Sequence, residues 1–299
     1  MNIFSPKNTG VAGNIWKYAI LYITNKRPYI TFLTIFLLTF PDTTVKTIGL
    51  LSLVGQIAGF LLEVPSGYIS DYLGHKRALV IAKISFLLSS LCYVLATSTW
   101  YFFVGAILLA IGIAMNSGTQ SAFLKESLDD LNLSTQYSSI SGKLRSIGFA
   151  IPILLILLVS FVGDFNFRIG FSIVLVTDLI GLITVCTLIS PKKQYETEEF
   201  RFRNIKKLFK TYTSLGWLKY VFFIEFMFAL GFGVTGGFKN PFQESLGFSV
   251  FALGVFWAIS RVGISGVLLL SGKLKERLTL KNFIVIQACL YTILFLGIG

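Results

Sequence analysis

Long apolar stretches alternate with short polar segments along the whole chain of 299 residues. The core of a bilayer is about 30 Å thick, and a helix needs roughly 20 mostly apolar residues to cross it, because lipid offers the backbone no hydrogen-bond partners. Stretches of this kind recur from the first helix to the last residue. The pattern predicts nine membrane-spanning helices, at residues 16–40, 45–69, 78–96, 100–124, 137–161, 167–190, 216–237, 248–271 and 282–299.

The composition agrees with an all-α integral membrane protein. Hydrophobic residues make up 54% of the chain and charged residues only 13%, which excludes a water-soluble fold. The net charge of +12 does not indicate nucleic-acid binding, because the basic residues are shared among short connections between apolar spans. Cys92, Cys186 and Cys289 lie inside apolar spans without metal-ligand or redox spacing, so we expect neither a metal nor a cofactor.

Lys and Arg are distributed unequally between alternate connections. The connections after spans two, four, six and eight hold sixteen of them, whereas those after spans one, three, five and seven hold three. Basic residues near the ends of spans are retained on the cytoplasmic side. We therefore expect a multi-pass protein of the cell membrane with its N-terminus in the cytoplasm.

The longest connection divides the spans into two groups. Residues 191–215 hold seven basic residues, interrupted by an acidic run, and we interpret them as a basic cytoplasmic linker that contacts anionic lipid headgroups; a solvated loop that only carries the orientation signal is the alternative. Residues 1–190 then form a six-helix bundle, and residues 216–299 the first helices of a second bundle. The last span is apolar up to its final residue, so we expect the second bundle to be truncated.

A short motif follows span two. From Gly67 to Arg77 it reads Gly-x-x-x-Asp-x-x-Gly-x-Lys-Arg. Gly67 would allow two helices to approach closely, and Gly74 would permit a tight turn. Asp71 can accept hydrogen bonds or pair with a cation, while Lys76 and Arg77 suit anchoring at the cytoplasmic interface.

This motif resembles the signature loop of the major facilitator superfamily of transporters. The resemblance implies two six-helix halves, of which this chain would hold about nine of twelve helices, and a gating role for Asp71. A degenerate second copy at Ser271–Leu278 follows span eight, as expected for parallel repeats. The chain lacks the basic residue that many members carry in span four and the Gly-Pro element of proton-coupled drug exporters in span five, which weakens an assignment to drug export.

Few ionisable side chains lie at bilayer depth, where they are costly and therefore mark a pathway or coupling site. The family architecture implies that spans one, four and seven line the cavity, with two, five and eight beside it. The candidate substrate or coupling residues on these spans are Arg27, Asn116, Gln120, Glu225 and Arg261. Arg27 could neutralise an anionic substrate, and Glu225 could take up a coupling proton.

Each candidate also has a structural interpretation. Arg27 or Lys26 could snorkel to the interface, and Glu225 could pair with Arg261 or Lys219. Asn116 and Gln120 could simply hydrogen-bond between helices. Asp178 lies on span six, an outer scaffold helix by this topology, so we expect it to be structural. Lys83, early in span three, is expected to snorkel.

The sequence thus favours secondary active transport of a small solute by alternating access, with proton-coupled efflux as one possible form. A non-transporting membrane scaffold or receptor is the main alternative. A membrane-embedded lipid-modifying enzyme is less favoured, since the only histidine, His75, has no acid placed for a His/Asp pair in the sequence. The expected partners are the solute, a proton and the lipid bilayer, and we expect the protein to act as a monomer.

Overall fold

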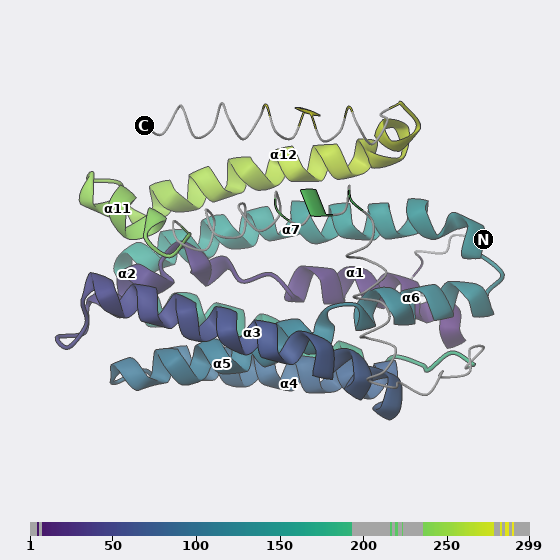
Figure 1. Cartoon of the computed structure of the whole chain (residues 1–299), viewed down its shortest axis with the longest axis horizontal. Coiled ribbons are helices and arrows are strands. Elements are labelled where there is room, and N and C mark those ends of the chain that lie inside the picture. Colours follow the sequence, from purple (N-terminus) through teal and green to yellow (C-terminus); the bar gives the residue numbers. More distant parts are fainter. Residues whose placement is uncertain are drawn as a thin grey trace.

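The structure is a computed structural model that describes residues 5, 8–192 and 236–277, together with the single positions 216, 219, 220, 223, 282, 285, 286 and 289. Within this part of the chain all regular secondary structure is helical (Figure 1). Six of its helical segments are long and apolar enough to cross a membrane. The all-α membrane fold expected from the sequence is therefore confirmed.

Five of the predicted spans form one continuous helix each. They are α3 (Val45–Leu73), α4 (His75–Val94), α7 (Tyr137–Phe165), α8 (Phe167–Cys186) and α12 (Val250–Arg277). Three shorter elements accompany them, namely η1 (Gly10–Gly13), η3 (Ser134–Gln136) and α11 (Lys239–Ser245). The predicted spans seven and nine and the 191–215 linker fall almost wholly outside the described residues.

The other two described spans are broken near their middle. Span one is divided into α1 (Asn14–Thr24), η2 (Pro28–Thr31) and α2 (Leu33–Leu38), and span four into α5 (Thr99–Asn116) and α6 (Thr119–Asp130). The sequence predicts each of them as one span, and Thr99–Asp130 has the length and hydropathy of one membrane span. The breaks in the helices are what the structure adds.

Local backbone chemistry explains both breaks. The ring of Pro28 cannot donate a hydrogen bond and keeps the preceding residue out of the helical region, and Arg27 accordingly has φ −118° and ψ 75°. In span four Ser117 is extended, with φ −60° and ψ 135°. Gly118 follows with φ +69°, in the left-handed region that glycine adopts without steric cost. Both spans therefore leave the helical conformation at residues that favour it least.

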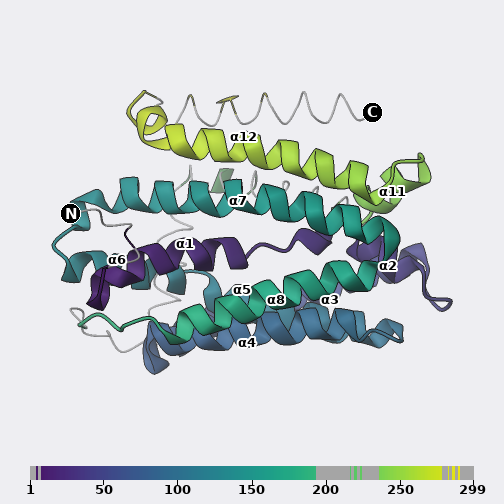
Figure 2. The same cartoon turned by 180° about the vertical axis from the view of Figure 1, so that it is seen from behind.

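The broken first span runs through the middle of the bundle. It has α7 and α12 on one side and α3, α4 and α5 on the other, and α12 lies along α7 (Figures 1 and 2). Its second half, formed by η2 and α2, packs into an aromatic cluster with Phe32 and Phe171, whereas α1 packs into a second cluster with Leu21 and Leu124. The break at residues 25–27 lies between these two apolar clusters along the chain, and polar side chains gather around it.

Candidate functional site

Three side-chain amides join the two helix breaks. Asn25, at the end of α1, donates from Nδ2 to Gln120 Oε1 over 3.0 Å and to Asn116 Oδ1 over 3.3 Å. Asn116 in turn donates to the same Gln120 oxygen over 3.2 Å. The structure thus brings together the two amides that the sequence singled out in span four, and adds Asn25 to them.

Lys83 on α4 binds the oxygen of one of these amides, that of Asn25. Its side chain is buried, and its Nζ donates to Asn25 Oδ1 over 2.6 Å and to Thr24 Oγ1 over 2.7 Å. Gly181 on α8 leaves the space for it, because a Cβ there would lie 2.7 Å from Lys83 Nζ and 2.6 Å from Thr24 Oγ1. The expectation that Lys83 snorkels is therefore wrong. Its side chain points into the bundle, where two oxygen acceptors bind the ammonium group.

A buried ion pair lies next to this lysine. Arg27 Nη1 is 2.6 Å from Asp178 Oδ1, and Ser90 Oγ donates to the other carboxylate oxygen over 2.6 Å. The side chain of Asp178 is fully buried, and that of Arg27 is 10% exposed. The guanidinium also lies over the ring of Phe86, with 4.1 Å between Cζ and the ring centroid. Arg27 is thus already neutralised by the protein.

Two other cations meet at one aromatic ring on α7. Lys26 Nζ lies 3.6 Å from the ring centroid of Phe149, and Arg261 Cζ, from α12, lies 5.1 Å from the same centroid. Arg261 also lies 5.6 Å from the ring of Trp257. We call Lys26, Arg261, Phe149 and Trp257 the cation pocket.

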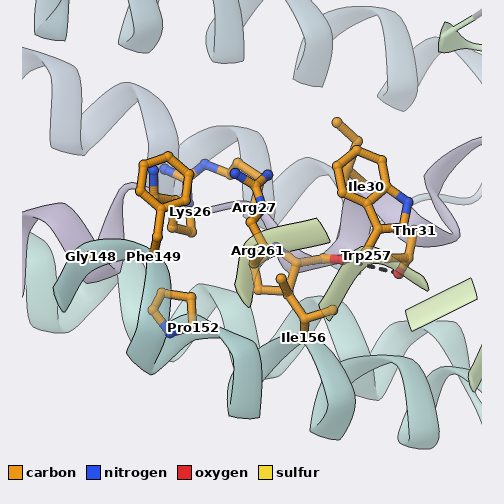
Figure 3. Close-up of a pocket in the computed structure, with 11 residues that line it drawn as sticks. Lys26, Arg27, Ile30, Thr31, Gly148, Phe149, Pro152, Ile156, Trp257 and Arg261 are labelled. Atoms are coloured by element: carbon orange, nitrogen blue, oxygen red, sulfur yellow. Dashed lines mark hydrogen bonds between the residues drawn. The ribbon is translucent and has the colours of Figure 1, made fainter. Parts of the chain in front are cut away.

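The cation pocket lies between the first span, α7 and α12. Figure 3 shows its side chains, with Phe149, Pro152 and Ile156 projecting from α7. Among the described lining residues there is no carboxylate. These side chains could offer positive charge, ring faces and aliphatic surface to a bound molecule. The free space between them holds about one water molecule, so a larger ligand requires the side chains to move apart.

The signature motif is mostly helical. Helix α3 continues through Asp71 to Leu73, and Gly74 makes the expected turn with φ +88° before α4 begins. Asp71 and Arg77 are exposed and Lys76 is half-buried. A Cβ on Gly67 would meet no described atom within 4 Å, so the close helix contact expected there is not made within the described part of the chain.

A hydrogen-bonded chain attaches this turn to α6. Ser70 Oγ lies 2.8 Å from His75 Nδ1, and His75 Nε2 lies 3.3 Å from Glu126 Oε1. Thr119, the first residue of α6, donates to Ser70 Oγ over 2.8 Å. The statement that His75 lacks a suitably placed acid is therefore wrong. The sequence prediction ends span four at residue 124 and so leaves Glu126 in the following connection, whereas helix α6 extends to Asp130 and carries Glu126 alongside the turn.

Comparison with known proteins places the chain in a family. The family model described as Major Facilitator Superfamily matches residues 18–299. The chain belongs to the major facilitator superfamily. A crystal structure of a mutant of the nucleoside transporter NupG has a TM-score of 0.68 and 16% sequence identity, over 88% of this chain and 68% of the NupG chain. No curated protein matches the sequence significantly.

Members of the major facilitator superfamily are multi-pass membrane proteins that carry small-molecule solutes. The membership confirms the resemblance seen in the motif and favours a transporter over the enzymatic alternative. The likeness to NupG, at this identity, concerns the fold alone.

The outcome for the candidate residues is mixed. Asn116 and Gln120 lie together at the breaks, Arg261 lines the cation pocket, and Arg27 reaches the edge of that pocket while paired with Asp178. Glu225 lies outside the described residues. Sequence reasoning missed Asn25 and the partners of Lys83 and Asp178. One signal was available in the sequence. Lys83 and Asp178 lie on two outer spans, and each charged side chain needs a polar or charged partner inside the bilayer.

Proposed function

We propose that this protein moves a small solute across the cell membrane by alternating access, with its N-terminus in the cytoplasm. Residues 1–190 act as the first bundle, residues 191–215 as the cytoplasmic linker and residues 216–299 as the start of the second bundle. The observation that carries the proposal is the position of the cation pocket. It lies where the break after α1, together with η2 and α7 of the first bundle, meets α12, which follows the linker. Rocking of two bundles about such a border exposes a site to each side in turn.

The two helix breaks support this assignment. Within a bilayer, non-helical backbone is tolerated only where it is buried in protein or lines a cavity, and transporters use discontinuous helices to build substrate sites. Here the breaks of spans one and four are joined by Asn25, Asn116 and Gln120. The first break continues directly into Lys26, which lines the cation pocket. The broken backbone and the pocket are therefore one continuous polar region.

The proposal includes a coupling and a gate. The transport proposed is efflux driven by a proton gradient, with Glu225 as the proton acceptor. Asp71 acts in the gate, because it is an exposed acid at the end of α3 beside the turn at Gly74, placed to contact a moving neighbour in one state. The hydrogen bonds of Ser70 and His75 fix that turn to α6, so that Asp71 moves with the first bundle.

The test is solute flux in vesicles that contain the full-length protein. Uptake, efflux and counterflow are measured across a panel of solutes, with and without a proton gradient, for wild type and Asp71→Asn. The control is Asp42→Asn, which changes an exposed acid just before the other end of α3. We expect wild type and control to move a solute and Asp71→Asn to move it several-fold more slowly with unchanged insertion. If no solute moves under any gradient, the scaffold or receptor interpretation replaces transport.

A further inference from the structure

We propose that the cation pocket binds a small organic anion, with Lys26 and Arg261 as its charge-binding residues. This inference deepens the proposed function, on which it rests for its physiological meaning. It assigns a substrate class, namely molecules that join a carboxylate or phosphate group to a compact apolar body.

The first observation is the difference in charge balance between cations of the same region. Arg27 has Asp178, and Lys83 has two oxygen acceptors. In the described part of the chain Lys26 and Arg261 contact only ring faces, and both are half-buried. Two like charges that share one ring repel each other in a medium that screens them poorly. An anion between them would relieve that repulsion.

The second observation is a pair of hydrogen-bond donors without an acceptor. Arg27 lines the pocket, and its Nε and Nη2 are buried with no partner in the described residues, although Nη1 is bonded to Asp178. Buried donors normally find an acceptor, and a guanidinium binds carboxylate or phosphate oxygens well through two parallel N–H groups. The donors of Arg27 that Asp178 does not use lie at the edge of the pocket, where the oxygen atoms of a ligand could accept from them after a small rearrangement.

The remaining lining determines the body of the ligand. Phe149 and Trp257 offer ring faces, while Pro152 and Ile156 offer aliphatic surface. Such walls favour an apolar group and give an inorganic anion little beyond charge. The position of the two charges also suits alternating access, because Lys26 belongs to the first bundle and Arg261 to α12. An anion held by both would join the two bundles when bound.

The test is binding, measured independently of flux. Thermal unfolding of the full-length protein in a neutral detergent is followed with benzoate and phenyl phosphate, each beside its neutral counterpart, benzamide or phenol. We expect the anions to raise the Tm by a few degrees and the neutral compounds to leave it unchanged. Lys26→Gln and Arg261→Gln should each abolish the rise. Lys143→Gln, an exposed lysine of α7 outside the pocket, should retain it.

Two further arms separate the alternatives. If Glu225 is the internal partner of these cations, Glu225→Gln should lower the Tm as much as Arg261→Gln does. Neither anion should then raise the Tm of the wild type, and this result would overturn the proposal. In phosphatidylcholine nanodiscs, phosphatidylglycerol tests a lipid headgroup as the source of phosphate. If phosphatidylglycerol raises the Tm in a way that depends on Arg261, and the soluble anions do not raise it, the pocket binds a lipid headgroup. That result overturns the proposal of a soluble organic anion.

The result is distinguishable from a failure of the proposed function. If only neutral or cationic solutes are transported and neither anion binds, transport stands and the anion site falls. If the anions bind through Lys26 and Arg261 but no solute moves, the site stands and transport falls.

Discussion

Lys26 and Arg27 are neighbours in the sequence but have opposite surroundings. Arg27 turns toward α4 and α8, where it meets Phe86 and Asp178, whereas Lys26 turns toward α7 and the ring of Phe149. The break between α1 and η2 makes this possible, because consecutive side chains there are not spaced as on one helix. One break therefore supplies one charge to the contact with α4 and α8 and another to the contact with α7 and α12.

The comparison separates two uses of a cation in a membrane protein. A charge at bilayer depth is costly unless it is paired or faces a polar cavity. The Arg27–Asp178 pair and the Lys83 contacts satisfy their charges between the first span, α4 and α8, so they hold these elements together. The charges of Lys26 and Arg261 are satisfied only by ring faces among the residues described, which leaves them available to a ligand.

Asp178→Asn should produce the largest loss of stability. It leaves the Arg27 guanidinium buried without its counter-ion, which costs about 3–5 kcal/mol in buried pairs. The measurement is the free energy of unfolding in mixed micelles, titrated with SDS and followed by tryptophan fluorescence.

A double variant tests whether this loss comes from the pair. Arg27→Met with Asp178→Leu removes both charges and should recover most of the stability, since well-packed apolar residues can replace a buried ion pair. Asp42→Asn is the control for loss of an acid at an exposed position. Arg27→Met and Asp178→Leu are also measured alone. If their losses of stability add up to that of the double variant, the pairing is contradicted.

Gly181→Ala should be the next most damaging change. The added Cβ would lie within 2.7 Å of both Thr24 Oγ1 and Lys83 Nζ, so the ammonium group must leave its place between α1 and α4. Overpacking of this kind costs about 1–3 kcal/mol. The matched control is Gly59→Ala on α3, where a Cβ meets nothing described within 4 Å. Equal Tm values for the two variants would show that Lys83 does not depend on this space.

The fold was largely predictable from the sequence, because apolar length and the Lys and Arg distribution depend on composition along the chain. The turn at Gly74 was also predictable, since only local conformation is involved. The partners of the buried charges could not be predicted from the sequence. Arg27 and Asp178 are 151 positions apart, and their contact depends on the rotation of α8 against the first span. No local pattern encodes that rotation.

Helix length explains the remaining errors at the site. Glu126 was assigned to a connection, yet α6 runs to Asp130 and places this acid beside His75. The break at Gly118 was likewise missed. The residues next to it, from Asn116 to Ser121, are polar, but the apolar stretches on either side of them suggest one helix. A sequence interpretation based on spans therefore finds the bundle but not the polar layer within it.

Glu126→Gln should have a small effect on stability. It weakens a contact whose two side chains are each 16% exposed, and pairs near the surface contribute at most about 1 kcal/mol. The same SDS titration that measures Asp178→Asn should give a much smaller change here, and Asp71→Asn should give none. A loss as large as that of Asp178→Asn would place the His75–Glu126 contact among the charges that hold the bundle together. A small loss with normal flux, beside slow flux in Asp71→Asn, would assign gating to Asp71 and only local attachment to Glu126.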